Sequence, residues 1–88
     1  MQIEGFIWID AIVDKVITKH GVYPDEVEEA FFNLPQKTIK AIEGRYRLYS
    51  RSESGRYLFV IFVWVGRHAK IISARDMTSS ERRFFARK

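Results

Sequence analysis

Cysteine is absent from this chain of 88 residues. Without thiols the protein has no disulfides, no thiolate zinc site and no cysteine nucleophile. Small secreted domains usually depend on disulfides, so the composition predicts a reducing, cytoplasmic location. The two histidines, His20 and His68, are not spaced like metal ligands and have no acidic cluster beside them. With no glycine-rich phosphate loop either, we expect neither a metal nor another cofactor.

Long apolar runs are also missing. The longest, residues 57–65, has the length of a strand and falls well short of the roughly 18 residues that span a membrane. No basic stretch precedes an apolar one at the N-terminus, so we expect no signal peptide and no membrane partner. The length fits one domain over residues 1–88, and the 47% hydrophobic content predicts a packed core.

The charge that is present is unevenly distributed along the sequence. Residues 1–33 carry seven acids and two bases, a net charge of −5, whereas residues 34–88 carry thirteen bases and four acids, a net charge of +9. Nine of those thirteen bases are arginine, whose planar guanidinium matches the geometry of a phosphate. This excess favours a polyanionic partner over a merely solvated basic surface.

The first half of the sequence predicts two helices. Residues 1–8 show no clear period and are expected to form a short lead-in. An apolar stripe predicts a helix over residues 10–19, with Asp10 as its N-cap and Gly21 in the left-handed position after its end. Pro24 is well placed to begin a second helix, and Pro35 ends it because the residue before a proline avoids the helical region.

The second half predicts strands followed by a terminal helix. Residues 45–51, 57–65 and 69–74 have strand character, with hairpin turns between them, and residues 37–42 are ambiguous. Thr78 and Glu81 form a capping box that begins the last helix. The expected fold is therefore α+β, with two N-terminal helices, an antiparallel sheet of three to four strands and a C-terminal helix. We expect its helices to lie on one face of the sheet.

Alternation along the strand at residues 45–51 gives a candidate binding surface. Side chains two apart share a face of a strand, so Arg45, Arg47, Tyr49 and Arg51 lie together. Three arginines and a tyrosine suit phosphates and a stacked base. We add Arg56, in the following hairpin, to this predicted RNA-binding set. The alternative is that these arginines only solvate the outer face of a half-buried sheet.

Two groups of motifs resemble the BrnT family of bacterial toxins. The helical part contains Lys19-His20-Gly21-Val22, then Pro24-Asp25-Glu26-Val27 and Ala30-Phe31-Phe32. The later part contains Arg51-Ser52-Glu53-Ser54-Gly55-Arg56-Tyr57-Leu58, then Ile71-Ile72-Ser73-Ala74-Arg75 with Met77-Thr78 and Glu81-Arg82. The resemblance covers most of residues 6–85. It implies a fold similar to RelE-type ribonucleases, cleavage of RNA, and neutralisation by a ribbon-helix-helix antitoxin that also represses the shared operon.

Two hypotheses of function remain open from the sequence. The first is a metal-independent endoribonuclease, in which Arg75 clamps the reacting phosphate, Arg51 and Arg82 assist, and Glu81 or Tyr49 moves the proton. The second is a module that binds nucleic acid or antitoxin without catalysis, which the lack of a clear acid–base pair favours. Both a homodimer and a toxin–antitoxin hetero-oligomer are compatible with either hypothesis.

Overall fold

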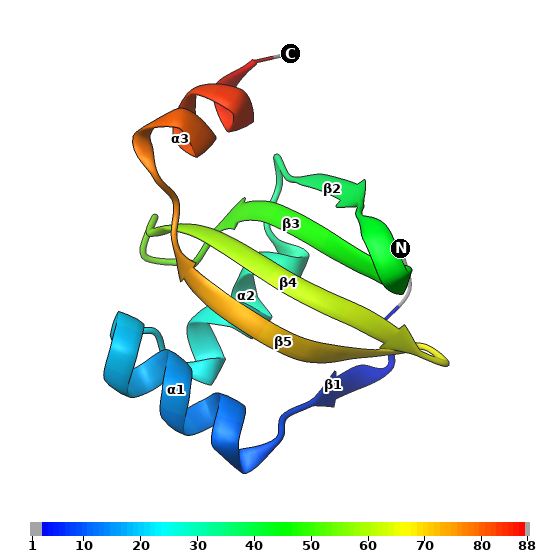
Figure 1. The fold of residues 1–88 in the computed structure, drawn as a ribbon. Coiled ribbons are helices and arrows are strands. Elements are labelled where there is room, and N and C mark those ends of the chain that lie inside the picture. Colours follow the sequence, from blue (N-terminus) through cyan, green and yellow to red (C-terminus); the bar gives the residue numbers. More distant parts are fainter. Residues whose placement is uncertain (1–2, 88) are drawn as a thin grey trace.

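The computed structural model describes residues 3–87, which form five strands and three α-helices. The strands make one sheet in the order β1-β5-β4-β3-β2 (Figure 1). The α+β prediction is confirmed, but the sheet is larger than the expected three to four strands. It is also mixed, because β1 runs parallel to β5. The strands span β1 Gly5–Ile7, β2 Lys37–Lys40, β3 Arg45–Arg51, β4 Tyr57–Val65 and β5 His68–Asp76.

Strand β1 lies where the sequence predicted only a short lead-in. It has only three residues and pairs with the beginning of β5, where Phe6 lies opposite Ala69. The Phe6 ring also packs edge-on against Phe31, with 5.1 Å between the ring centroids. So short a strand has no period of its own, and its partner lies more than 60 residues away in the sequence. Local pattern could not predict it.

Helices α1 (Asp10–His20) and α2 (Pro24–Phe32) follow the predicted positions closely. Gly21 has φ 63° and ends α1 in the left-handed conformation, as expected. Pro24 begins α2, and the helix ends before Pro35. The prediction of Asp10 as N-cap is wrong by one residue, because Ile9 holds that position and makes no side-chain capping bond.

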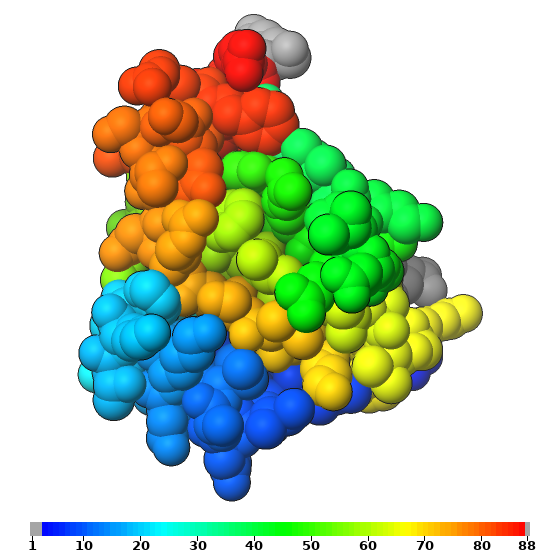
Figure 2. Space-filling model, viewed as in Figure 1, coloured from blue at the N-terminus to red at the C-terminus, as the bar shows by residue number. Residues whose placement is uncertain are grey.

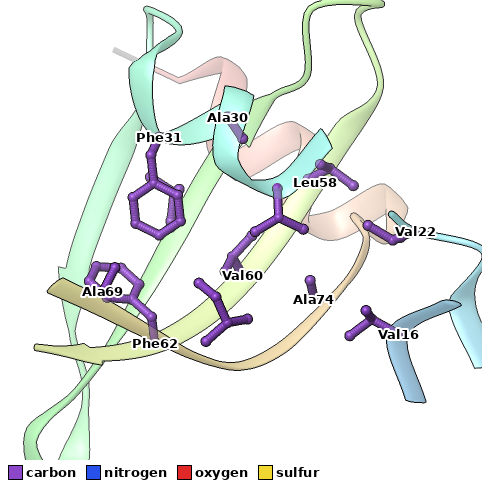
Figure 3. Close-up of a cluster of buried hydrophobic side chains, with 12 residues drawn as sticks. Val16, Val22, Ala30, Phe31, Leu58, Val60, Phe62, Ala69 and Ala74 are labelled. Atoms are coloured by element: carbon purple, nitrogen blue, oxygen red, sulfur yellow. The ribbon is translucent and has the colours of Figure 1, made fainter. Parts of the chain in front are cut away.

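The main core lies between these two helices and one face of the sheet (Figure 3). Phe62 is fully buried at its centre, edge-on to Phe31 with ring centroids 4.9 Å apart and stacked on Tyr46. Burial of this apolar surface is the main favourable contribution to folding. The buried residues are Val16, Val22, Val27, Ala30 and Phe31 on the helical side, and Leu48, Leu58, Val60, Phe62, Ala69, Ile71 and Ala74 in the sheet.

Helix α3 (Ser79–Ala86) lies on the opposite face of the sheet, which corrects the expectation that the helices share one face. It begins with the predicted capping box: Thr78 Oγ1 accepts from the Glu81 N–H at 3.2 Å, and the Glu81 carboxylate accepts from the Thr78 N–H at 2.8 Å. Phe84 then packs on Tyr49, with ring centroids 4.9 Å apart. Alternation in a strand predicts two faces but does not tell which of them another element covers.

Helix α3 covers only one end of that face. A second apolar cluster on this face consists of the buried Tyr49, Phe59 and Met77, and the partly buried residues that pack against it are Ile39, Tyr57, Ile61, Phe84 and Phe85. In Figure 2, atoms of β3, β4 and β5 remain visible between α3 at the top and α1 at the lower left, while α2 is hidden behind the sheet. The sheet therefore has one face largely covered by α1 and α2 and one face that α3 covers only in part.

Candidate functional site

A groove of about 680 Å³ lies between α3 and the adjoining ends of β2, β3 and β4. Its lining brings together residues 35–37, Arg51, Tyr57 and residues from the segment 82–87. Among the described residues that line it there are five bases and no acid, and the bases are Lys37, Arg51, Arg82, Arg83 and Arg87. A concave surface with cations alone raises the local concentration of an anionic ligand.

Tyr57 lies in this groove beside two arginines. The centre of its ring is 4.0 Å from the guanidinium carbon of Arg82 and 5.7 Å from that of Arg51. Cation–π contacts of this kind hold a guanidinium over the ring face and leave its N–H groups free to donate elsewhere. Within residues 3–87, neither arginine forms an ion pair with a carboxylate. Arg51 and Arg82 are therefore available to an external anion.

Lys37 connects the groove's two walls. Its Nζ lies 4.4 Å from the centre of the Phe84 ring and donates a hydrogen bond to the Phe84 carbonyl oxygen. This contact joins edge strand β2 to the last turn of α3. A positive charge suits that position because the carbonyl end of a helix is the negative end of its dipole. Lys37 therefore positions α3 and also adds charge to the groove.

Arg75 and Glu81, both predicted as catalytic, contact each other. Arg75 Nη1 and Nη2 donate to the two Glu81 oxygens at 2.7 and 2.8 Å, and the guanidinium lies 4.4 Å from the centre of the Phe59 ring. Hydrogen bonding to Glu81 raises the pKa of Arg75, and hydrogen bonding to Arg75 lowers the pKa of Glu81. Glu81 also caps α3, so it is poorly suited to accept a further proton. The geometry favours an ion pair that fastens α3 to β5.

The predicted RNA-binding residues do not form one surface. The expected parity is correct, but Tyr49 is only 6% exposed because Phe84 covers it, so its ring cannot stack on a base. Arg45 and Arg47 are exposed, but neither is among the lining residues of the groove. Of this set, Arg51 alone lines the groove.

Arg56 lies outside the groove as well. Its Nε and Nη2 donate to the two Asp76 oxygens at 2.6 and 3.0 Å, and Nη1 contacts Glu26 at 3.2 Å. It also donates to the carbonyl oxygens of His20 and Gly21. Arg56 thus ties the β3–β4 hairpin to the connection between α1 and α2, which is a structural role.

Sequence reasoning missed the four other basic or hydroxyl-bearing lining residues of the groove: Lys37, Tyr57, Arg83 and Arg87. A signal for Tyr57 was present, because a hairpin that turns at residues 53–55 places residue 57 opposite Arg51, as the register shows. No comparable signal existed for Lys37, Arg83 and Arg87. They depend on α3 folding back over the sheet, which follows from tertiary packing.

The two ion pairs predict how stability depends on pH. Hydrogen bonding to Arg56 lowers the pKa of Asp76, as Arg75 lowers that of Glu81. A carboxyl group with a lowered folded-state pKa stabilises the protein above its ordinary pKa, and this contribution is lost as pH falls through the lowered value. We expect the melting temperature to fall as pH drops below about 4. Glu81→Gln should reduce this dependence, and an unchanged profile would contradict the Glu81 contribution.

Two further properties concern residues 3–87. None of their helices has both the length and the apolar character that crossing a membrane requires. Nor do these residues place three or more histidine, aspartate or glutamate side chains in a cluster that could hold a metal ion.

Comparison with known proteins gives a match to a family model and a match to a solved structure of that family. A family model described as "Ribonuclease toxin, BrnT, of type II toxin-antitoxin system" matches residues 8–81. The fold is similar to that of the Brucella abortus ribonuclease toxin BrnT, known from a 1.1 Å crystal structure. The TM-score is 0.71 and the sequence identity 23%, over 85% of this chain and 97% of that chain. A search of curated protein sequences found no match. Because the family model spans most of the sequence, the chain belongs to the BrnT family of ribonuclease toxins of type II toxin–antitoxin systems.

Proposed function

We propose that this toxin binds and cleaves RNA in the groove between α3 and the sheet, without a metal ion. The observation that supports this most strongly is the contact of Arg51 and Arg82 with the Tyr57 ring, in a groove with no acid among its described lining residues. Five basic side chains supply the positive charge that a phosphate chain requires. Lys37 and Arg51 belong to strands β2 and β3, and Arg82 and Arg83 belong to α3, so a regular backbone carries these four side chains.

The proposed reaction is attack of a ribose 2′-oxygen, which gives up its proton to water, on the adjacent phosphorus. The bond to the 5′-oxygen breaks, which leaves a 2′,3′-cyclic phosphate and a 5′-hydroxyl. Negative charge grows on the phosphate oxygens in the transition state. Arg51 and Arg82 can donate to these oxygens, and donors placed in advance contribute much of the rate in such sites. Tyr57 carries the one hydroxyl among the described lining residues, and we assign it the protonation of the leaving 5′-oxygen.

Arg75 and Glu81 act indirectly in this scheme. Their ion pair fixes the first turn of α3, and Arg82 follows Glu81 directly in that helix. The pair therefore sets the position of one side of the groove. For the antitoxin, the sequence resemblance supports a small ribbon-helix-helix protein that forms a hetero-oligomer with the toxin and blocks its activity.

Incubation of the purified toxin with structured RNA in excess EDTA tests metal independence. We expect cleavage at defined sites, with 2′,3′-cyclic phosphate ends, because the 2′-oxygen is the nucleophile. The matched control is Arg67→Ala, which removes an exposed arginine outside the groove and should cleave normally. A gel shift without cleavage would instead support a binding module. Cleavage that appears only when Mg²⁺ is added would contradict the metal-free reaction.

A further inference from the structure

The part of the sheet that α3 leaves uncovered has a composition of its own. Cross-strand partners share a face of the sheet, and here apolar and basic residues are partners: Arg47 lies opposite both Ile39 and Ile61, and Val63 lies opposite both Arg45 and Lys70. We call this region the open sheet surface, defined by Ile39, Ile61, Val63, Arg45, Arg47 and Lys70.

Each component of the open sheet surface is accessible. Arg45 and Arg47 are exposed, and Lys70 and the three apolar residues are half-buried. Ile39 lies in the edge strand β2, and Ile61 and Val63 lie in the interior strand β4. Within residues 3–87, no carboxylate pairs with Arg45, Arg47 or Lys70. An apolar strip with unpaired cations around it is typical of a protein interface rather than of a solvated sheet.

We infer that the open sheet surface binds an acidic amphipathic segment of the antitoxin. Apolar side chains of that segment would cover Ile61 and Val63, and its carboxylates would pair with Arg45 and Arg47. Charge complementarity of this kind speeds association and selects the partner. The inference rests on the proposed function, because it assigns antitoxin to this surface and RNA to the groove.

RNA fits the open sheet surface less well than protein does. Single-stranded RNA is usually bound by aromatic rings that stack on bases, and the apolar strip here is aliphatic. Tyr49 shares the face but lies beneath α3. A second copy of this chain fits poorly as well, because two such surfaces would place like charges together.

The surface lies beside the groove without being part of it. Ile39 is two residues from Lys37 on the same face of β2, and Arg47 is four residues from Arg51 on the same face of β3. A segment bound here would end near the groove and could block the entry of RNA. Because the two residue sets do not overlap, mutations can separate antitoxin binding from RNA cleavage.

The test compares two charge-matched double variants, with the antitoxin from the toxin's own operon as the probe. Arg45→Glu/Arg47→Glu changes the open sheet surface. Lys15→Glu/Lys40→Glu changes two exposed lysines outside it and alters the net charge equally. Calorimetry gives the antitoxin Kd, and an RNA assay gives the cleavage rate of each free toxin. Circular dichroism checks that both variants fold.

We expect Arg45→Glu/Arg47→Glu to weaken antitoxin binding about 100-fold or more, since opposed like charges cost several kcal/mol. The cleavage rate of this variant should stay within about threefold of the parent's. The lysine control should keep both its antitoxin Kd and its cleavage rate within the same range, as is usual for surface substitutions. Unchanged antitoxin affinity, or an equal loss in the control, would overturn the inference. Loss of cleavage with antitoxin affinity retained would assign RNA to this surface instead. Absence of cleavage in the parent toxin would contradict the proposed function, while the affinity comparison would still test this inference.

Discussion

Replacing either Arg51 or Arg82 with alanine should slow RNA cleavage about 100- to 1000-fold, the range found when a donor to a transition-state oxyanion is removed. Both side chains lie over Tyr57, have no carboxylate partner within residues 3–87 and line the groove. Their loss should leave stability nearly unchanged, because neither guanidinium takes part in the core. Single-turnover cleavage rates measure this effect.

Lysine variants at the same two positions separate the effect of charge from the effect of guanidinium geometry. Arg51→Lys and Arg82→Lys keep the charge but lose the planar, two-pronged contact with phosphate. We expect them to bind RNA nearly as well as the parent and to recover only part of the cleavage rate. The control is again Arg67→Ala. Alanine variants that cleave at the parent's rate would remove the two arginines from the reaction.

Arg75→Lys and Glu81→Gln should each destabilise the protein by about 1–2 kcal/mol, the range for a part-exposed, charge-assisted hydrogen-bonded pair. Glutamine can still cap the helix, so Glu81→Gln removes the ion pair and keeps the capping box. The double variant should lose little more than either single one, because both remove one interaction. Urea denaturation followed by circular dichroism gives these free energies of unfolding.

The same variants separate a positioning role from a direct one. If the Arg75–Glu81 pair positions α3, both single variants should reduce cleavage to a similar degree. If Arg75 clamps the reacting phosphate, Arg75→Lys should lose most cleavage with stability retained, whereas Glu81→Gln should cleave normally. That second pattern would restore Arg75 to the catalytic role predicted from sequence.

Local chemistry explains which parts of the fold could be predicted. The ends of α1, α2 and α3 depend on a proline, a left-handed glycine and a capping box, all of which act within a few residues. Strand β4 is predictable because it is continuously apolar over nine residues. Strand β1 and the position of α3 depend on partners far along the sequence, and no local pattern carries that information.

The candidate site shows the same division. Alternation placed Arg51 on the correct face, and the resemblance directed attention to Arg82. The prediction that Tyr49 binds RNA is wrong because α3 buries its ring, and the sequence does not show where α3 packs. Arg56 was predicted to bind RNA because of its charge. In the structure its guanidinium donates hydrogen bonds to Asp76, to Glu26 and to the Gly21 carbonyl oxygen. A basic side chain is available to a ligand only where the fold leaves it without an acidic neighbour.

A structure of the toxin with a short RNA whose ribose 2′-hydroxyls are replaced by 2′-methoxy groups would locate the substrate directly. Such an RNA lacks the attacking nucleophile, so it should remain intact. We expect one phosphate within hydrogen-bonding distance of both Arg51 and Arg82, with Tyr57 beside the 5′-oxygen. RNA bound across Arg45 and Arg47, with the groove empty, would contradict the assignment of cleavage to the groove.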